Sequence, residues 1–209
     1  MTAKRTRNQR GQGALLRSEL IDAAMRILDR SPNSTLSLRM VAKEAGVAAP
    51  SVYAHFTDVR HLMADIVREC WNQLADEMGD GVVSDGDARD SIKRQLCAYV
   101  RYAMERPSRY QLLFALQPID ANEQSDLPGV IQPAFRKVRD ALREIRDAGY
   151  EIPGEGSFSA ALLVLSLIHG RIALAHLAPW REGNSASGVE KFVVEIVDRL
   201  MRPATAHKA

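Results

Sequence analysis

Apolar residues recur every three or four positions along most of this 209-residue chain, which is the spacing of amphipathic helices. The first such stripe runs from Leu16 to Leu28 and lies on one helical face. It is followed by residues 31–34, Ser-Pro-Asn-Ser, which favour a turn. The pattern therefore predicts a first helix that ends just before this turn.

Two short helices are predicted next. Ser37 is placed to cap the first of them, because its hydroxyl can accept a hydrogen bond from an amide of the first turn. Gly46 ends that helix, since a tight turn here needs the left-handed conformation. Residues 48–55 predict the second short helix, with Pro50 in its first turn, where the missing N–H costs no hydrogen bond. A glycine turn between two short helices, behind a longer one, is typical of a helix-turn-helix.

The remaining residues predict longer helices. Asp58 can cap one that stops near residues 79–81, and Pro107 begins a shorter one. The other predicted elements are a helix at 87–105, a loop at 117–129, a helix ending at 148, a helix at 158–177 and a last helix over 189–201. No segment shows sustained alternation of apolar and polar residues. The predicted fold class is therefore all-α with about nine helices, an N-terminal three-helix helix-turn-helix domain and a larger helical body.

Composition and sequence pattern argue against several classes of protein. The longest uncharged run, residues 156–170, is about five residues shorter than the roughly 20 that cross a bilayer, so we expect a buried helix and no membrane partner. Cys70 and Cys97 form neither a zinc-binding nor a disulfide pattern. The basic N-terminus is not followed by the apolar stretch of a signal peptide, so a cytoplasmic location is expected.

Charge is distributed unevenly along the chain. The whole sequence has 28 basic and 26 acidic residues, a formal net charge of +2. Residues 1–63 hold ten basic and five acidic residues, which gives +5 and leaves −3 for the remainder. A basic N-terminal third indicates contact with a polyanion, although the charge alone leaves chance open as an explanation.

The residues from Leu36 to Leu62, LSLRMVAKEAGVAAPSVYAHFTDVRHL, resemble the DNA-binding domain of TetR-family transcriptional regulators. The resemblance consists of a Gly-Val turn at Gly46, a Tyr-x-His-Phe sequence that ends at Phe56, and a leucine six residues later. It covers about residues 14–63, and the chain length and helix count fit this family over the whole sequence.

The body of the chain carries two shorter matches, RPSRYQLLF at 106–114 and HGRIAL at 169–174, which look like elements of a subgroup of these regulators. The resemblance implies a helix-turn-helix DNA-binding domain at 14–63 and a helical effector-binding and dimerisation domain at 64–209. Residues 1–13 are basic and nearly free of apolar side chains, so we expect a flexible arm. The implied function is that of a sequence-specific regulator, a repressor released from its operator by a small molecule.

The resemblance places the third helix in the major groove of DNA and the start of the second helix at its edge. Arg39 matches a position that contacts bases, where a guanidinium can bond guanine O6 and N7 and add about 1–3 kcal/mol of discrimination; contact with phosphate alone is the alternative. Tyr53 and His55 resemble a pair that contacts the DNA backbone, with local packing as the alternative. The predicted DNA-binding residues are Lys4, Arg5, Arg7, Arg10, Ser37, Arg39, Ala49, Pro50, Ser51, Tyr53, His55 and Arg60.

Three residues depart from the family pattern. Ala48 stands at the usual Ser or Thr cap, which removes about 1 kcal/mol of helix stability. Ala49 offers the groove a methyl group and no hydrogen bond, and Val59 stands where the family commonly has a phosphate-binding lysine. Few direct contacts with bases are therefore expected. The arm from Lys4 to Arg10 is expected to contribute more of the affinity, by lying along the DNA backbone or in a minor groove. A solvated tail is the alternative for the arm.

One helix-turn-helix covers about half of an operator, so a two-fold dimer on a palindromic operator is expected. The resemblance implies an interface made by the last two long helices, which suits the apolar stripe from Val189 to Met201, although core packing explains such a stripe as well. The effector is expected to be a small apolar or aromatic molecule. Its predicted pocket residues, each of which core packing also explains, are Trp71, Tyr102, Met104, Phe114, Phe135 and His169.

Other functions find less support. Gly154-Glu155-Gly156 lacks the third glycine and the preceding strand of a dinucleotide-binding loop, and no nucleophile elbow or HExxH motif is present, so an enzyme is not expected. His169 and His176 share a helical face, but no third ligand is near them in sequence, so no metal or other cofactor is expected. The remaining rival is a DNA-binding regulator that has no small-molecule effector and responds to a protein partner.

Overall fold

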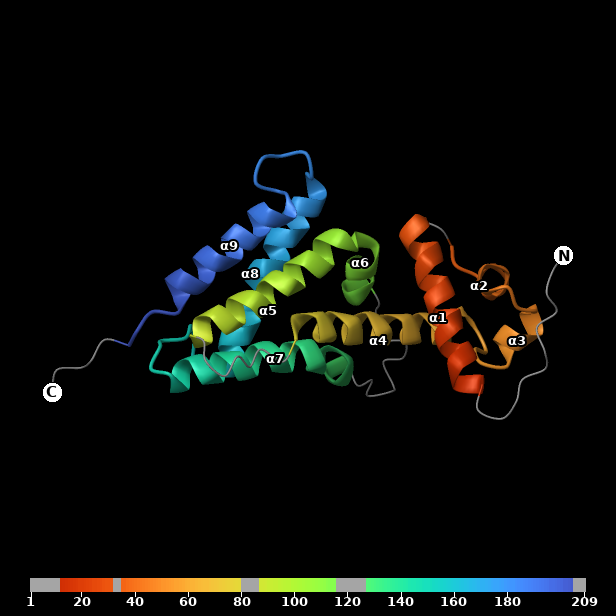
Figure 1. The fold of residues 1–209 in the computed structure, drawn as a ribbon, viewed down its shortest axis with the longest axis horizontal. Coiled ribbons are helices and arrows are strands. Elements are labelled where there is room, and N and C mark those ends of the chain that lie inside the picture. Colours follow the sequence, from red (N-terminus) through yellow and green to blue (C-terminus); the bar gives the residue numbers. More distant parts are fainter. Residues whose placement is uncertain (1–11, 32–34, 80–86, 116–126, 205–209) are drawn as a thin grey trace. The chain divides into compact units, whose positions relative to one another are not determined.

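The computed structural model describes residues 12–31, 35–79, 87–115 and 127–204. Within these ranges it contains nine α-helices and no β-strand, which confirms the predicted all-α class (Figure 1). The helices are α1 (Gln12–Arg30), α2 (Leu38–Ala45), α3 (Ala49–Tyr53), α4 (Val59–Met78), α5 (Ala88–Glu105), α6 (Pro107–Ala115), α7 (Leu127–Asp147), α8 (Ser157–Leu177) and α9 (Ala186–Leu200).

The chain divides into two compact units after Glu69, a point inside α4. The first unit, here called the DNA unit, contains α1, α2, α3 and the N-terminal part of α4. Helix α2 packs against both α1 and α3. The apolar side chains of these helices meet in one core, whose most deeply buried members are Leu20, Ala23, Ala24, Val41, Val52, Phe56, Leu62 and Ile66.

The second unit, here called the body, is built around α5. This helix packs against α6, α7, α8 and α9, and Figure 1 shows it running between α7 and α9. Burial of a large apolar side chain stabilises a fold by about 1.5–3 kcal/mol, so the many buried residues of α5 contribute substantially to the body's stability. The fully or nearly fully buried residues of α5 are Ile92, Leu96, Tyr99, Val100, Tyr102 and Ala103.

The predicted start and end of α2 and the predicted cap of α4 are confirmed, whereas α3 is shorter than the predicted 48–55. The Ser37 hydroxyl accepts a hydrogen bond from the Met40 amide at 3.3 Å, and the Asp58 carboxylate accepts one from the His61 amide at 2.9 Å. Gly46 has a φ of 68°, the left-handed conformation in which glycine has no steric cost. These local signals fix where α2 and α4 begin and where α2 stops.

Helix α1 begins earlier than the apolar stripe predicts, at Gln12 instead of Leu16. Gln12 and Gly13 are therefore helical and do not belong to the flexible arm predicted for residues 1–13. Ala14 and Leu15 are strong helix formers, and they extend the helix beyond its buried face without contributing to the stripe. The rest of the predicted arm lies outside the described residues.

Helix α7 also begins earlier than predicted, because residues 127–129 were expected to lie in a loop. Pro128 indicated a loop from the sequence, but it occupies the first turn of α7, where its missing N–H breaks no helical hydrogen bond. The helix also contains Pro133. The other residues of the predicted loop, 117–126, lie outside the described part of the chain.

Candidate DNA-binding surface and effector pocket

The first turn of α2 presents Arg39 to solvent. The Ser37 cap leaves the helix start well formed, and buried Leu38 and Val41 hold the opposite side of the helix in the core. Arg39 and Met40 consequently face away from the core and are exposed. The start of α2 is therefore a capped helical turn with a cation on its solvent-exposed side.

Helix α3 separates its buried residues from its exposed ones. Val52 and the following Phe56 are buried, whereas the Tyr53 side chain is 52% exposed. Pro50 is exposed as well, and Ser51 and His55 are half-buried. Because Val52 and Phe56 already fill the core, the Tyr53 hydroxyl is available to a partner outside the unit.

Ala48 stands where the family usually has a Ser or Thr cap, and the expected loss of a side-chain cap is seen. Ala48 occupies the N-cap position of α3, and no side-chain hydrogen bond caps this helix. Ala49 is half-buried behind it. The front of α3 therefore offers no side-chain hydrogen bond from either residue.

The basic residues of the DNA unit fall into two groups. Arg26 and Arg30 bind Glu44 at 3.2 and 2.5 Å, and the hydrogen bond from Arg30 is the main reason that the pKa of Glu44 is lowered. Arg39 and Arg60 are exposed, at the starts of α2 and α4. Some of the positive charge counted from the sequence thus ties α1 to α2, and some faces solvent.

Arg17 connects α1, the end of α3 and α4 within the DNA unit. The sequence did not predict this role. The Arg17 guanidinium donates a hydrogen bond to the His55 carbonyl at 2.8 Å and binds the Asp65 carboxylate at 2.5 Å. The same guanidinium lies 4.5 Å from the centre of the Phe56 ring, a cation–π arrangement. Arg68 binds Asp65 as well, at 2.7 Å. Arg17 therefore connects α1 to the end of α3 and to α4.

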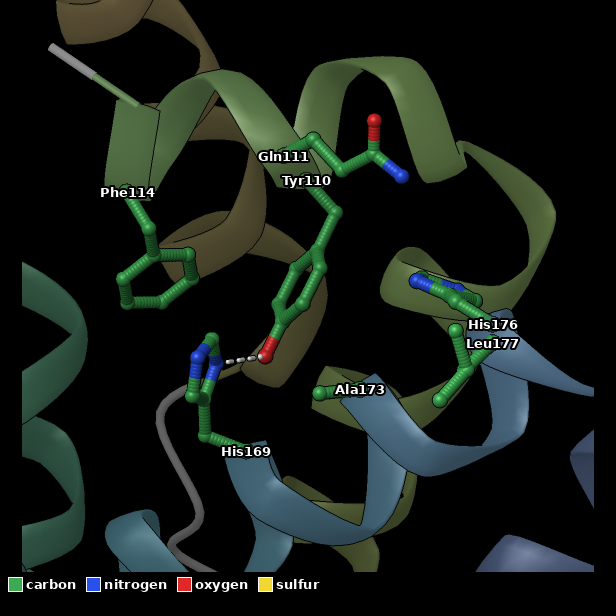
Figure 2. Close-up of a pocket in the computed structure, with 7 residues that line it drawn as sticks. All are labelled: Tyr110, Gln111, Phe114, His169, Ala173, His176 and Leu177. Atoms are coloured by element: carbon green, nitrogen blue, oxygen red, sulfur yellow. Dashed lines mark hydrogen bonds between the residues drawn. The ribbon is translucent and has the colours of Figure 1, made fainter.

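The body contains a pocket of about 450 Å³ between α6 and α8 (Figure 2). Aromatic rings make up most of its wall. The ring centres of Tyr110 and Phe114 lie 5.2 Å apart, and those of Phe114 and His169 lie 4.2 Å apart. This cavity is called the aromatic pocket below, and its lining residues are Tyr110, Gln111, Phe114, His169, Ala173, His176 and Leu177.

Hydrogen bonds hold the rings of the aromatic pocket in place. The Tyr110 hydroxyl lies 2.7 Å from Nδ1 of His169, as Figure 2 shows, and 2.9 Å from the Tyr99 hydroxyl. Burial lowers the pKa of both His169 and His176, and for His169 the neighbouring His176 lowers the pKa further. Burial also raises the pKa of Tyr99 to about 12. The polar groups around the pocket are therefore uncharged near neutral pH.

The structure brings only part of the predicted pocket set together. Phe114 and His169 line the aromatic pocket, and the Trp71 ring packs edge-on against Phe114 with ring centres 5.7 Å apart. Tyr102 lies in the interior, where its hydroxyl donates to the Cys70 carbonyl at 3.2 Å. Phe135 packs against Phe158 of α8, and half-buried Met104 is not among the lining residues.

Sequence reasoning did not select the other lining residues. Tyr110 and Phe114 lie four positions apart in α6, and His169, Ala173 and His176 lie at helical spacing in α8. Side chains at such spacings share one face of a helix. The spacing was therefore a usable signal for a shared face, although it does not reveal that the two faces meet.

Within the described ranges, no three His, Cys, Asp or Glu side chains come together in a way that could hold a metal ion. His169 and His176 instead use ring nitrogens for contacts with Tyr110 and with the backbone of Ala103.

Helix α8 combines a buried face with an exposed apolar face. Ala160, Val164, Ile168 and Ile172 are fully buried. Among the described residues α8 is the one helix long and apolar enough to span a membrane, with a mean hydropathy of 1.8, although only 33% of that stretch is buried. Its exposed apolar residues are Phe158, Leu162, Leu163, Leu167, Leu174 and Leu177.

Comparison with known proteins places both units in one family. Residues 20–69 match the family described as bacterial regulatory proteins, tetR family, and residues 92–200 match the tetracyclin repressor-like C-terminal domain. The two matches cover the helix-turn-helix and most of the body. The molecule is thus a helix-turn-helix transcription regulator with a DNA-binding domain and a helical C-terminal domain. The chain belongs to the TetR family, whose members bind DNA operators and function as dimers.

The individual relatives share only a small fraction of identical residues with this chain. The chain is 26% identical over 163 residues to the uncharacterized HTH-type transcriptional regulator Rv0681 of Mycobacterium tuberculosis, a match that covers 77% of this chain and 70% of that protein. A protein of unknown function from Rhodococcus sp. RHA1 has a similar fold, with a TM-score of 0.74, 21% identity and coverage of 95% and 98%. The fatty acid degradation regulator FadR of Bacillus halodurans is also similar in fold, with a TM-score of 0.70, 14% identity and coverage of 91% and 96%.

Proposed function

We propose that this protein is a dimeric repressor that binds a palindromic operator and is released from it by a small molecule bound in the aromatic pocket. The observation that carries the proposal is that one chain combines a helix-turn-helix unit with a separate, aromatic-lined cavity of about 450 Å³. Cavities of about 300–1,000 Å³ with mostly apolar walls and a few polar groups are typical of small-molecule sites.

In the proposed complex α3 lies in the major groove and Arg39 contacts a base at its edge. The exposure of Arg39 on a capped helix start supports this role. Tyr53 and Ser51 contact phosphates or base edges, and Arg60 contacts a phosphate near the start of α4. The basic arm from Lys4 to Arg10 adds affinity that carries little sequence information.

Dimerisation is proposed to use the exposed apolar face of α8 together with α9. Exposed leucines along one side of a helix whose other side is buried need a second apolar surface to leave water. Val194 of α9 is a further exposed apolar residue. A partner subunit explains this face better than a lipid bilayer, because α8 also carries Arg171 and two histidines.

Selection of binding sites from random DNA with purified protein tests the DNA part of the proposal. We expect a two-fold symmetric sequence with half-sites about one helical turn, or a multiple of it, apart. Arg39→Ala should relax the preference at one position in each half-site, whereas the same change at exposed Arg94 of α5 should leave the selected sequence unchanged. Recovery of no preferred sequence would refute the proposal.

Sedimentation measurements test the interface. Leu174→Glu in α8 should convert the dimer to monomer, because a charge would replace an apolar contact between subunits. Leu15→Glu is the matched control, since Leu15 and Leu174 are 59% and 60% exposed and Leu15 lies in α1. A wild-type protein that is monomeric at micromolar concentration, or a Leu174→Glu variant that remains dimeric, would contradict this interface.

Effector release separates the proposal from control by a protein partner. A ligand that binds only the folded protein raises its melting temperature, and linkage requires an effector to weaken operator binding by the same factor as the operator weakens effector binding. A ligand that stabilises the body without changing the affinity for the selected operator would favour the protein partner.

A further inference from the structure

A chain of three polar atoms borders the aromatic pocket: the hydroxyls of Tyr99 and Tyr110, 2.9 Å apart, and Nδ1 of His169, 2.7 Å from Tyr110. Both tyrosines are buried, so each hydroxyl proton needs an acceptor. Two hydrogen bonds use two protons, and only one arrangement employs both hydroxyl protons. In it Tyr99 donates to Tyr110, and Tyr110 donates to Nδ1 of His169.

This arrangement fixes the tautomer of His169. Because Nδ1 accepts a hydrogen bond, the proton of the neutral imidazole lies on Nε2. The lowered pKa of His169, caused mainly by burial, supports the neutral form. The His169 ring lines the pocket, so its Nε2–H is a hydrogen-bond donor for a bound molecule.

His176 interacts with the backbone of Ala103, and its Nε2 is buried, so this nitrogen has almost no surface that a bound molecule could reach. Burial lowers the pKa of His176 as it lowers that of His169, so neither histidine presents a charge to the pocket near neutral pH. Of the two imidazoles, that of His169 therefore supplies the polar group that a ligand can meet.

The pocket wall contains no Asp, Glu, Lys or Arg among its seven described lining residues. A carboxylate bound here would meet no cation among these residues, so no charged partner would compensate for the water that it loses against the rings. A ligand cation would meet the N–H of His169 and no carboxylate. Four aromatic or imidazole rings surround the space, with Tyr110 5.7 and 5.9 Å from the ring centres of His169 and His176. Such rings favour offset or edge-on contact with another planar ring.

We propose that the aromatic pocket binds an uncharged, planar aromatic molecule whose hydroxyl oxygen accepts a hydrogen bond from Nε2 of His169. The inference rests on the proposed function, in which a ligand of this pocket releases the operator. It specifies two properties of that ligand: the ligand is uncharged, and its hydroxyl group is the polar group that the pocket recognises. A volume of about 450 Å³ is sufficient for two or three fused rings.

Calorimetric titration of the full chain with four naphthalene derivatives tests the proposal. The probes are 2-naphthol, naphthalene, 2-naphthoate and 2-naphthylmethylammonium, which share a ring system and differ in the polar group. We expect 2-naphthol to bind about three- to tenfold more tightly than naphthalene, the effect of one hydrogen bond, and both charged probes to bind more weakly than 2-naphthol.

His169→Phe should remove the preference for 2-naphthol over naphthalene and leave the affinity for naphthalene nearly unchanged, because the ring remains and the donor is lost. His61→Phe is the matched control, since His61 is exposed and lies in the DNA unit. If circular dichroism shows that His169→Phe is not folded, Tyr110→Phe replaces it. That variant removes the hydrogen bond that fixes the tautomer of His169, and the same preference should fall.

Three results would overturn the inference: no binding of 2-naphthol, tighter binding of a charged probe, or an unchanged preference in the folded variant. Operator binding is measured separately. Failure to bind any operator would refute the proposed function while the calorimetry still decides the ligand class. Binding of 2-naphthol with the expected preference but without operator release would refute the effector role and retain the ligand class.

Discussion

Replacement of Arg17 by methionine would show whether one side chain of α1 fixes the end of α3. Methionine keeps an unbranched apolar stem and removes the guanidinium. The change removes the hydrogen bond to the His55 carbonyl at 2.8 Å, the ion pair with Asp65 at 2.5 Å and the contact 4.5 Å above the Phe56 ring. All three contacts join α1 to residues that follow α3.

The expected loss of stability is about 2 kcal/mol. A hydrogen bond from a charged donor contributes about 1.5–3 kcal/mol, and a cation–π contact at an exposed site about 0.5–1 kcal/mol. The ion pair adds little, because the Arg17 side chain is 42% exposed and Asp65 keeps its 2.7 Å contact with Arg68. Contacts that share one side chain are not additive, so the total stays near the lower part of the sum.

Hydrogen exchange of the α3 amides measures this loss directly. A decrease of about 2 kcal/mol in the opening free energy speeds exchange by about 30-fold when closing is fast. Arg68→Met is the matched control, because Arg68 binds the same carboxylate from within α4. Equal acceleration in both variants, or none in Arg17→Met, would refute the role assigned to Arg17. Operator affinity should fall in Arg17→Met as well, since α3 would be less often in place.

Two further predictions concern helix caps and acid stability. Ser37→Ala should lower the free energy of unfolding by about 1 kcal/mol, because the Met40 amide loses its acceptor. Ala48→Ser should raise the free energy of unfolding by up to about 1 kcal/mol, because it would cap α3. Urea unfolding followed by circular dichroism measures both changes, and midpoints that moved in the opposite directions would contradict them. Burial holds the pKa of His169 below its usual 6.5, so the unfolded state binds this proton more tightly and stability falls as the pH drops below 6.5. His169→Phe should therefore show a smaller decrease in melting temperature between about pH 7 and about pH 5, and a decrease as large as that of the wild type would argue against a neutral, buried His169.

Local signals in the sequence predicted the helix ends well. The cap at Ser37 and the left-handed Gly46 depend on residues within four positions, so their structural roles follow from the sequence alone. The starts of α1 and α7 do not, because a helix can extend over residues that bury nothing or contain a proline in the first turn. The apolar pattern reports where a helix packs, and a helix can be longer than its packed part.

Contacts between distant residues explain what the sequence could not show. Arg17 meets His55 and Asp65, which are 38 and 48 positions away, and no spacing rule joins them. In the pocket, Phe114 and His169 were predicted, but Tyr110 was not, although it completes their contact. Tyr102 was predicted to line the pocket and instead lies in the interior, because α5 is surrounded by other helices and its aromatic residues are buried on more than one side.

The division of the chain after Glu69 has a genetic consequence. In the proposed dimer the surface that pairs subunits, on α8 and α9, belongs to the body, whereas the residues proposed to read DNA belong to the other unit. A chain with a disabled DNA unit and an intact body would still pair with normal subunits. The resulting mixed dimers would have one functional DNA unit and would bind only one half of the operator. Loss-of-function alleles in residues 14–63 are therefore expected to be dominant over the normal allele, and alleles that abolish pairing through α8 are expected to be recessive.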